Sequence, residues 1–457
     1  MTKLTLISPI DGSVLAERPV MSLEAAQSAA DQARAAQKLW AARPIEERIE
    51  LVMAGVAKIG EQTERMAKEL ALQMGRPIRY GGEFGGFNDR ASYMASIAKD
   101  ALAPIMVEDS NTAKRMIKRL PAGVVLIVAP WNYPYMTAIN TLAPALISGS
   151  TVILKHATQT LMVGEHLAEA FHAAGVPEDV FRNVHWDHDT TSALIAERAF
   201  DVVNFTGSVG GGRAMEKAAA GTFTQVATEL GGKDPGYVRA DADVDAAVAG
   251  LIDGAMFNSG QCCCGIERIY VHESRYDEFV EKAVALVRTY KLGDPMDRET
   301  TIGPMANVRF ARVVRDQLTQ ALEMGATAHI DTFPEDDGAA YVTPQILTDV
   351  THEMAVMTEE TFGPLVGIMP VRDDDHAVEL MNDCQYGLTV SLWTKDVEAA
   401  EALGDRLETG TVFMNRCDYL DPALCWTGCK DTGRGAGLSV LGYHALTRPK
   451  SYHLKKG

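Results

Sequence analysis

The spacing of hydrophobic residues changes about 120 residues into the chain. Before that point apolar positions recur at helical intervals, which predicts helices over 22–40, 45–74 and 83–102. The first twenty residues predict a short hairpin that turns at Asp11-Gly12. Beyond 121 the chain carries short, continuous runs of apolar residues, the pattern of strands buried on both faces. The sequence therefore predicts a helical segment followed by an α/β region.

The α/β region predicts a parallel sheet, because strand patterns alternate with helical ones. We expect its strands at 124–130, 151–155, 201–208 and 225–232, with helices at 135–147, 160–174, 190–197 and 210–220. Ligands bind at the carboxyl ends of such strands. Polar stretches follow each strand there, namely WNYP, KHAT, TGS and ELGGK.

A second strand-helix series begins near residue 241. We expect helices at 243–257, 307–324, 374–383 and 396–407, a further helix ending near Tyr290, and strands at 269–273, 341–347, 364–370, 388–393 and 411–415. Residues 111–120 alternate basic and apolar side chains, which favours an exposed edge strand that could pair with another subunit.

Composition narrows the possible partners. The chain has 457 residues and a net charge of −18, with a pI of about 5.1, which argues against nucleic acid or anionic membranes as partners. No apolar run approaches a bilayer span. The cysteines number seven, and three of them are adjacent, unlike a secreted disulfide framework. We expect a reducing, cytoplasmic setting.

The adjacent cysteines, Cys262, Cys263 and Cys264, follow a Ser-Gly-Gln turn in the stretch FNSGQCCCGIER. Residue type alone leaves a nucleophile, a packed core and a metal site at comparable odds. We expect no metal, because consecutive cysteines should not comfortably supply three ligands and no CxxC pair accompanies them.

Two polar residues at strand ends also admit two interpretations. Glu229 is either a solvated charge or a base facing the thiol. Asn132 is either a turn former or a donor to an oxyanion.

The motifs in chain order resemble the aldehyde dehydrogenase superfamily over nearly the whole sequence. They are APWNYP, ILK, FTGS, ELGGK, FNSGQCCC, EETFGP and GTVFMN. The resemblance implies an α/β fold with two Rossmann-like parallel-sheet domains and a small β oligomerisation element. We place a cofactor-binding domain at 1–106 and 121–234, a catalytic domain at 235–437, and the oligomerisation element at 107–120 and 438–457, and we expect a homodimer or homotetramer.

The same resemblance implies a catalytic set. Cys263, in the GQ-x-C register, would attack an aldehyde, Asn132 and the Cys263 backbone N–H would hold the oxyanion, and Glu229 would activate the water that hydrolyses the thioester. The neighbouring cysteines would have no catalytic role. Alternatives are a CoA-acylating semialdehyde dehydrogenase, against which Glu229 argues, and an inactive binding relative.

The resemblance also implies an NAD or NADP site. Its residues would be Trp131, Lys155, Thr158, Gly207, Ser208, Gly212, Leu230, Glu360 and Phe362. The family often has glutamate where this chain has Thr158, and that glutamate repels a 2′-phosphate. We therefore hypothesise that NADP is accepted, against the alternative that NAD is still preferred.

The substrate is weakly indicated. Candidate channel residues are Tyr135, Met136, Met256, Phe257, Cys262, Cys264 and Arg416. Arg416 could bind the carboxylate of a semialdehyde such as succinate semialdehyde, although a subunit contact is the favoured interpretation for it.

Overall fold

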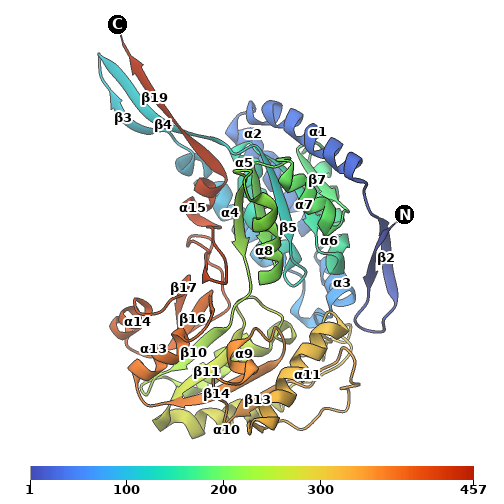
Figure 1. Ribbon diagram of the computed structural model, residues 1–457, viewed down its shortest axis with the longest axis vertical. Helices are drawn as coiled ribbons and strands as arrows, with labels where there is room; N and C mark the ends of the chain where they lie inside the picture. The colour runs from blue at the N-terminus through green and yellow to red at the C-terminus, as the bar shows by residue number, and fades with distance from the viewer. Residues whose placement is uncertain (1, 457) are drawn as a thin grey trace.

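The computed structural model describes residues 2–456 and contains two separate parallel sheets (Figure 1). The first has the order β7-β6-β5-β8-β9, with every neighbouring pair parallel. Its strands are β5 (Val124–Ala129), β6 (Thr151–His156), β7 (Phe181–Val184), β8 (Val202–Thr206) and β9 (Gln225–Glu229). All four predicted strands are present. The sequence prediction missed β7, whose FRNV sequence has a polar centre rather than an apolar run.

Helices surround this sheet as predicted, with one exception. They are α1 (Leu23–Ala41), α2 (Ile45–Gly60), α3 (Thr63–Met74), α4 (Phe84–Ala101), α5 (Pro134–Ser148), α6 (Leu161–Ala173), α7 (His188–Ala196) and α8 (Val209–Ala219). The pattern at 45–74, predicted as one helix, divides into two because Gln62 leaves the helical conformation, with φ −127° and ψ 29°. The Asp11-Gly12 hairpin is also present, formed by β1 (Lys3–Ile7) and β2 (Val14–Pro19).

The second sheet has the order β12-β13-β14-β11-β10-β16-β17, with only β12 antiparallel to its neighbour. Its strands are β10 (Asp234–Val238), β11 (Ile266–His272), β12 (Thr327–Ala328), β13 (Gln345–Thr348), β14 (Leu365–Val371), β16 (Thr389–Trp393) and β17 (Thr411–Met414). The helices of this part are α9 (Val244–Met256), α10 (Tyr276–Val287), α11 (Val308–Glu323), α12 (Ala355–Thr358), α13 (Asp374–Asn382) and α14 (Val397–Gly404).

Strand β10 was missed because its sequence, DPGYV, begins with two residues that are unusual in a strand interior. A Cβ at Gly236 would lie 2.4 Å from the end of the Leu251 side chain, so a larger residue would require Leu251 to shift. The chain passes from the first sheet to the second between Glu229 and Asp234. The domain boundary at 234 stays a prediction.

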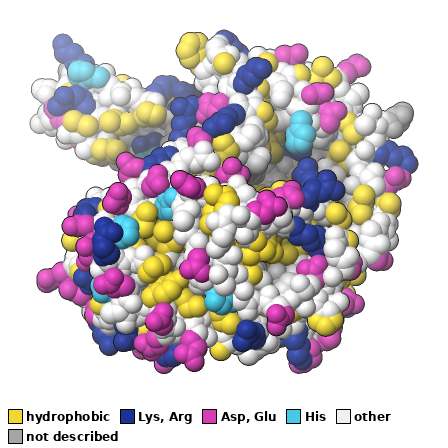
Figure 2. All heavy atoms as spheres, turned by 60° about the horizontal axis from the view of Figure 1, so that its bottom comes forward, with side chains coloured by type: hydrophobic (Ala, Val, Ile, Leu, Met, Phe, Trp, Pro, Cys, Tyr) yellow, Lys and Arg dark blue, Asp and Glu magenta, His cyan; other side chains and the backbone are white. Residues whose placement is uncertain are grey.

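A third sheet projects from the body as an arm (Figure 1). It contains β3 (Ile105–Asp109), β4 (Ala113–Pro121) and β19 (Thr447–Lys455), and α15 (Ser439–Ala445) leads into the last strand. The predicted edge position of residues 111–120 is wrong, because β4 pairs with both β3 and β19. Alternating basic and apolar residues show that the two faces of a strand differ. They do not show how many strands pair with it. Basic and hydrophobic side chains are mixed on the arm (Figure 2).

One further small ladder joins β15 (Tyr386–Gly387) to β18 (Cys429–Lys430). Within residues 2–456, no helix has both the length and the apolar character needed to cross a bilayer.

Candidate active site

The loop that carries the three cysteines begins with an unusual backbone. It leaves α9 through the short 3-10 turn η3 (Phe257–Gly260), in which Asn258, Ser259 and Gly260 all have positive φ. At Gly260 a Cβ would lie 2.2 Å from the Gly363 carbonyl oxygen. Glycine is therefore required, because the 363 segment approaches the loop too closely for any side chain.

Gln261 holds this turn in place. Its amide nitrogen donates to the Asn258 carbonyl at 3.1 Å, and its amide oxygen accepts from the Ala306 N–H at 2.8 Å. Both bonds are buried, so the position of the following cysteines is set by the turn itself and by the distant segment at Ala306.

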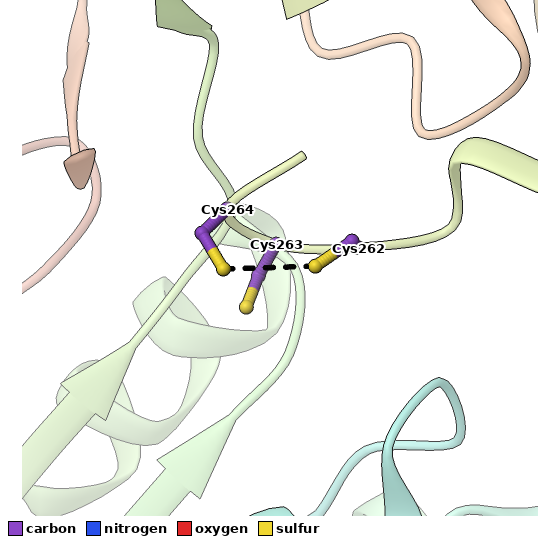
Figure 3. A group of neighbouring side chains, drawn as sticks. All are labelled: Cys262, Cys263 and Cys264. Atoms are coloured by element: carbon purple, nitrogen blue, oxygen red, sulfur yellow. Dashed lines mark hydrogen bonds between the residues drawn. The ribbon is translucent and has the colours of Figure 1, made fainter. Parts of the chain in front are cut away.

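The three sulfurs converge (Figure 3). The Gly265 N–H donates to the Cys262 carbonyl, so the cysteines lie on one tight turn, and their Sγ atoms are all within 4.8 Å of one another. Consecutive cysteines thus gather more closely than we expected from the sequence. Cys262 and Cys264 are buried, whereas Cys263 is half-buried.

Of the three cysteines, the middle one is favoured as the thiolate. The neighbouring Cys262 and Cys264 side chains lower the pKa of Cys263. The adjacent Cys263 side chain raises the pKa of Cys262 to about 12. The thiolate is therefore favoured at Cys263, the sulfur that is also most accessible.

Asp418 lies against the cluster, and sequence reasoning missed it. Its Oδ1 accepts from the thiols of Cys262 and Cys264, each at 3.1 Å. Burial raises the pKa of this carboxyl well above its usual range. No motif pointed to Asp418, because it lies in a loop far along the chain.

A cavity of about 350 Å³ opens beside the cysteines. Both Cys263 and Glu229 line it, together with Leu230. Glu229 ends β9, and its Oε2 accepts from the Thr206 hydroxyl at 3.3 Å. Burial raises the pKa of Glu229 to about 7. A carboxyl group with that pKa can take or release a proton near neutral pH.

Asn132 lies directly after β5 and against the cysteine loop. Its Nδ2 donates to the Gln261 carbonyl at 3.3 Å, and the side chain is buried. An amide nitrogen carries two hydrogens, so this bond leaves one for a further acceptor.

A buried ion pair between Arg76 and Glu83 supports the loop that contains Asn132. No sequence motif predicted this pair. Arg76 donates to Glu83 and also to the Asn132 carbonyl and the Asn258 side chain. Glu83 in turn accepts from the first backbone N–H groups of α5, at Tyr135 and Met136.

The residues implied for cofactor binding meet at the carboxyl end of the first sheet. Lys155 lies near the end of β6, and Thr158 begins the short 3-10 turn η2 (Thr158–Thr160). Burial lowers the pKa of Lys155, and we find no hydrogen-bond acceptor for its ammonium group within residues 2–456. A buried ammonium without an acceptor fits a ligand that supplies oxygens, such as a ribose.

Helix α8 begins at the same carboxyl end of the first sheet as Lys155. Ser208 is its N-cap and accepts from the Gly211 N–H, and Gly207 bonds to the Glu229 carbonyl. A Cβ at Gly212 would lie 2.7 Å from the Leu230 side chain. The N-terminus of a helix of eleven residues, bordered by glycines, fits a diphosphate.

Glu360 and Phe362 reach the same region from the second sheet. Glu360 Oε1 accepts from the Gly232 N–H at 3.1 Å. Burial and the neighbouring Glu267 raise the pKa of Glu360 to about 8. Phe362 lies edge-on to Trp131, at 5.5 Å between ring centroids.

Glu267 positions that loop, and sequence reasoning missed it. It accepts from the backbone N–H groups of Thr361 and Phe362, each at 2.8 Å, and from the buried Lys233 ammonium at 2.8 Å. The available signal was the pair of adjacent charged residues, Glu267 and Arg268, inside a strand pattern.

The predicted channel is partly correct. Met136, Phe257, Cys262 and Cys264 line the cavity. Tyr135, Met256 and Arg416 are not among its lining residues. The Tyr135 hydroxyl bonds to Glu69, Met256 is packed in the core of the second sheet, and Arg416 lies over the Tyr419 ring at 3.8 Å. Arg90 is the arginine that lines the cavity instead.

Comparisons with known proteins identify the family of this chain. The sequence profile of the aldehyde dehydrogenase family matches residues 1–452. A succinate-semialdehyde dehydrogenase [NADP(+)] of Deinococcus radiodurans is 31% identical over 97% of this chain and 93% of its own length. A 2-hydroxymuconic semialdehyde dehydrogenase of Pseudomonas putida is 33% identical over 98% of this chain and 95% of its own.

Solved structures are similar over the whole chain. A succinic semialdehyde dehydrogenase of Streptococcus pyogenes in complex with NADP+ superimposes with a TM-score of 0.94, at 28% identity, covering 99% of both chains. The NADP-dependent glyceraldehyde-3-phosphate dehydrogenase of Bacillus halodurans C-125 gives a TM-score of 0.94 at 31% identity, covering 100% of this chain and 96% of that one.

Proposed function

Because this chain belongs to the aldehyde dehydrogenase family and is an NAD(P)-dependent oxidoreductase acting on aldehydes, we propose that Cys263, Glu229 and Asn132 carry out the reaction. The product is a carboxylic acid. The proposal extends the family assignment to particular residues and to a hydrolytic route.

The first step uses the Cys263 thiolate, which forms a bond to the aldehyde carbon while the carbonyl electron pair moves to oxygen. The second N–H of the Asn132 amide and the Cys263 backbone N–H stabilise this oxyanion. NAD(P)+, when bound, supplies the hydride acceptor that converts the adduct to a thioester.

Glu229 then completes the cycle. Its carboxylate takes a proton from water, the water oxygen bonds to the thioester carbon, and the Cys263 sulfur leaves as thiolate. The observation that carries this route is that Cys263 and Glu229 line the same cavity while burial raises the pKa of Glu229 to about 7. A CoA-acylating enzyme would have no use for a base placed there.

For the substrate, we propose an aldehyde with a carboxylate at its other end, such as succinate semialdehyde. Arg90 lines the cavity, and its Nη1 is held by the Met136 carbonyl at 3.0 Å and the Asn140 side chain at 3.3 Å. Guanidinium has five N–H donors, so most remain for a ligand. Relatives with similar sequences are named for semialdehydes.

Steady-state kinetics with succinate semialdehyde and butanal test this substrate. Arg90→Met should raise KM for the semialdehyde at least tenfold and leave KM for butanal nearly unchanged, because only the former has a carboxylate. Arg416→Met is the matched control and should affect neither KM. If the wild-type enzyme preferred butanal, or Arg90→Met changed both KM values equally, the carboxylate assignment would be wrong.

We also propose a cytoplasmic homodimer or homotetramer that assembles through the arm. The edge strand β3 exposes Ile105, Met106 and Val107, which supports pairing with another subunit. Light scattering after size-exclusion chromatography should give two or four chains. A monomer at micromolar concentration would contradict the proposal.

A further inference from the structure

Four ligand-type atoms lie close together beside the cavity. The sulfurs of Cys262, Cys263 and Cys264 form one cluster, and a carboxylate oxygen of Asp418 contacts two of them, those of Cys262 and Cys264. Reversible thiol chemistry at Cys263 needs only one of them. The other three form a donor set that the dehydrogenase reaction does not use.

The spacing of these atoms approaches that of a tetrahedral metal site. The sulfurs of Cys262 and Cys264 face each other at 3.6 Å (Figure 3). Each of them is 3.1 Å from Asp418 Oδ1. Zinc-sulfur bonds of about 2.3 Å place two sulfurs of a tetrahedron about 3.8 Å apart. The Cys263 sulfur lies within 4.8 Å of both others, so it needs to move only about 1 Å.

Asp418 is the observation that favours a cation over simple packing. Its side chain is half-buried in the wall of the cavity, and within residues 2–456 we find no lysine, arginine or histidine paired with it. Buried carboxylates are normally paired with a cation or coordinate a metal. Cys263 is half-buried and lines the cavity, which gives an ion a path to the site.

We propose that Cys262, Cys263, Cys264 and Asp418 bind one thiophilic d¹⁰ cation, with Zn²⁺ as the ion and Cd²⁺ as its spectroscopic substitute. Any of the three cysteines that is still a thiol loses its proton to solvent as its sulfur coordinates the ion, and no electron is transferred. Binding itself is independent of the proposed function. Its consequence, reversible inactivation, rests on the proposed role of Cys263, because coordination occupies the sulfur lone pair that attacks the aldehyde.

A cadmium titration of the reduced, full-length protein without cofactor tests binding directly. Thiolate-to-cadmium charge transfer absorbs in the ultraviolet in proportion to the number of thiolates bound. We expect saturation at one ion per chain with the amplitude of three thiolates, and displacement by Zn²⁺. No saturation at one equivalent would overturn the proposal.

Variants then assign the ligands. Cys262→Ser and Cys264→Ser should each remove one thiolate from the absorbance and weaken binding at least tenfold. Asp418→Asn should weaken binding while all three thiolates still contribute. Cys384→Ser, at a cysteine outside the cluster, is the matched control and should leave stoichiometry, amplitude and affinity unchanged. Equal binding by all four variants would place the metal elsewhere.

Activity measured in the same samples separates the two proposals. Zn²⁺ should inhibit the wild type along the same curve as it binds, and a chelator should restore the rate. An active enzyme without a saturable cadmium band would overturn the metal site and leave the proposed function standing. A saturable three-thiolate band in a protein that oxidises no aldehyde would support the metal site and overturn the proposed function.

Discussion

Arg76 donates to Glu83 over 2.7 Å, and both side chains are almost completely buried, with 4% and 1% of their surface exposed. The pair joins the segment after α3 to the segment before α4, and it contacts the Asn132 carbonyl and the start of α5. It therefore positions the proposed oxyanion donor without touching the substrate.

Arg76→Met should lower kcat by about tenfold to a hundredfold, because misplacing a catalytic group by about 1 Å can cost about 10²-fold. KM for the cofactor should change little, and Arg76→Lys should restore part of kcat. Breaking a buried pair also costs about 3–5 kcal/mol of stability. Kinetics and thermal melting measure both effects.

The exposed pair Arg43–Glu47 provides the control. Arg43→Met removes a similar pair at the surface, where such pairs contribute about 0–1 kcal/mol, and should leave kcat unchanged. A loss of stability in Arg76→Met with kcat and its pH profile intact would show that the pair only supports the fold.

Cys263→Ala should abolish turnover while leaving cofactor binding intact. Cys262→Ala and Cys264→Ala should retain turnover but raise the pKa of Cys263, because each removes a neighbouring thiol that favours its thiolate form. The rate of Cys263 alkylation by iodoacetamide against pH reports that shift. An unchanged alkylation profile in both variants would mean that the neighbouring thiols do not tune the nucleophile.

Glu229→Gln should stall hydrolysis of the thioester. We expect a burst of reduced cofactor followed by steady turnover lowered about 10²-fold or more. In the wild type the base must be a carboxylate, and its pKa is raised to about 7 by burial. Deacylation should therefore speed up as pH rises through about 7 and slow as pH falls below it. Stopped-flow kinetics would contradict the assignment if the variant showed no burst and normal turnover.

Thr158→Glu should shift cofactor use toward NAD. A glutamate there would repel the 2′-phosphate of NADP, and a change in kcat/KM of about tenfold corresponds to about 1.4 kcal/mol. The ratio of kcat/KM for the two cofactors is the measurement. Thr160→Val, at a fully buried threonine in the same turn, serves as the comparison. A strong wild-type preference for NAD would contradict the hypothesis that Thr158 admits NADP.

The hydrophobic pattern predicted the elements whose residues are uniformly buried. It missed elements that contain residues unusual for their secondary structure, such as proline and glycine in a strand. Continuous apolar runs identified β5 and β6, whereas Pro235 and Gly236 concealed the interior strand β10. The alternation in β4 indicated a strand correctly but could not show that it has two neighbours.

The candidate site divides in the same way. Cys263, Glu229 and Asn132 stand in recognisable local motifs, and their proposed roles stay predictions. The residues that position them do not stand in such motifs. Arg76 and Glu83 hold a loop about fifty residues further along the chain, and Glu267 accepts from backbone N–H groups more than ninety positions away. Pairings between remote side chains have no period, so only the folded chain reveals them.

The arm has a consequence for how the protein is made. Its central strand pairs with the last strand of the chain, so that Arg119 and Thr447 bond across 328 positions. During synthesis β3 and β4 emerge early, yet one edge of β4 has no neighbour until β19 has been made. Such long-range pairing forms slowly. The three-stranded arm therefore closes late, and assembly of subunits through it would select chains in which β19 is already paired.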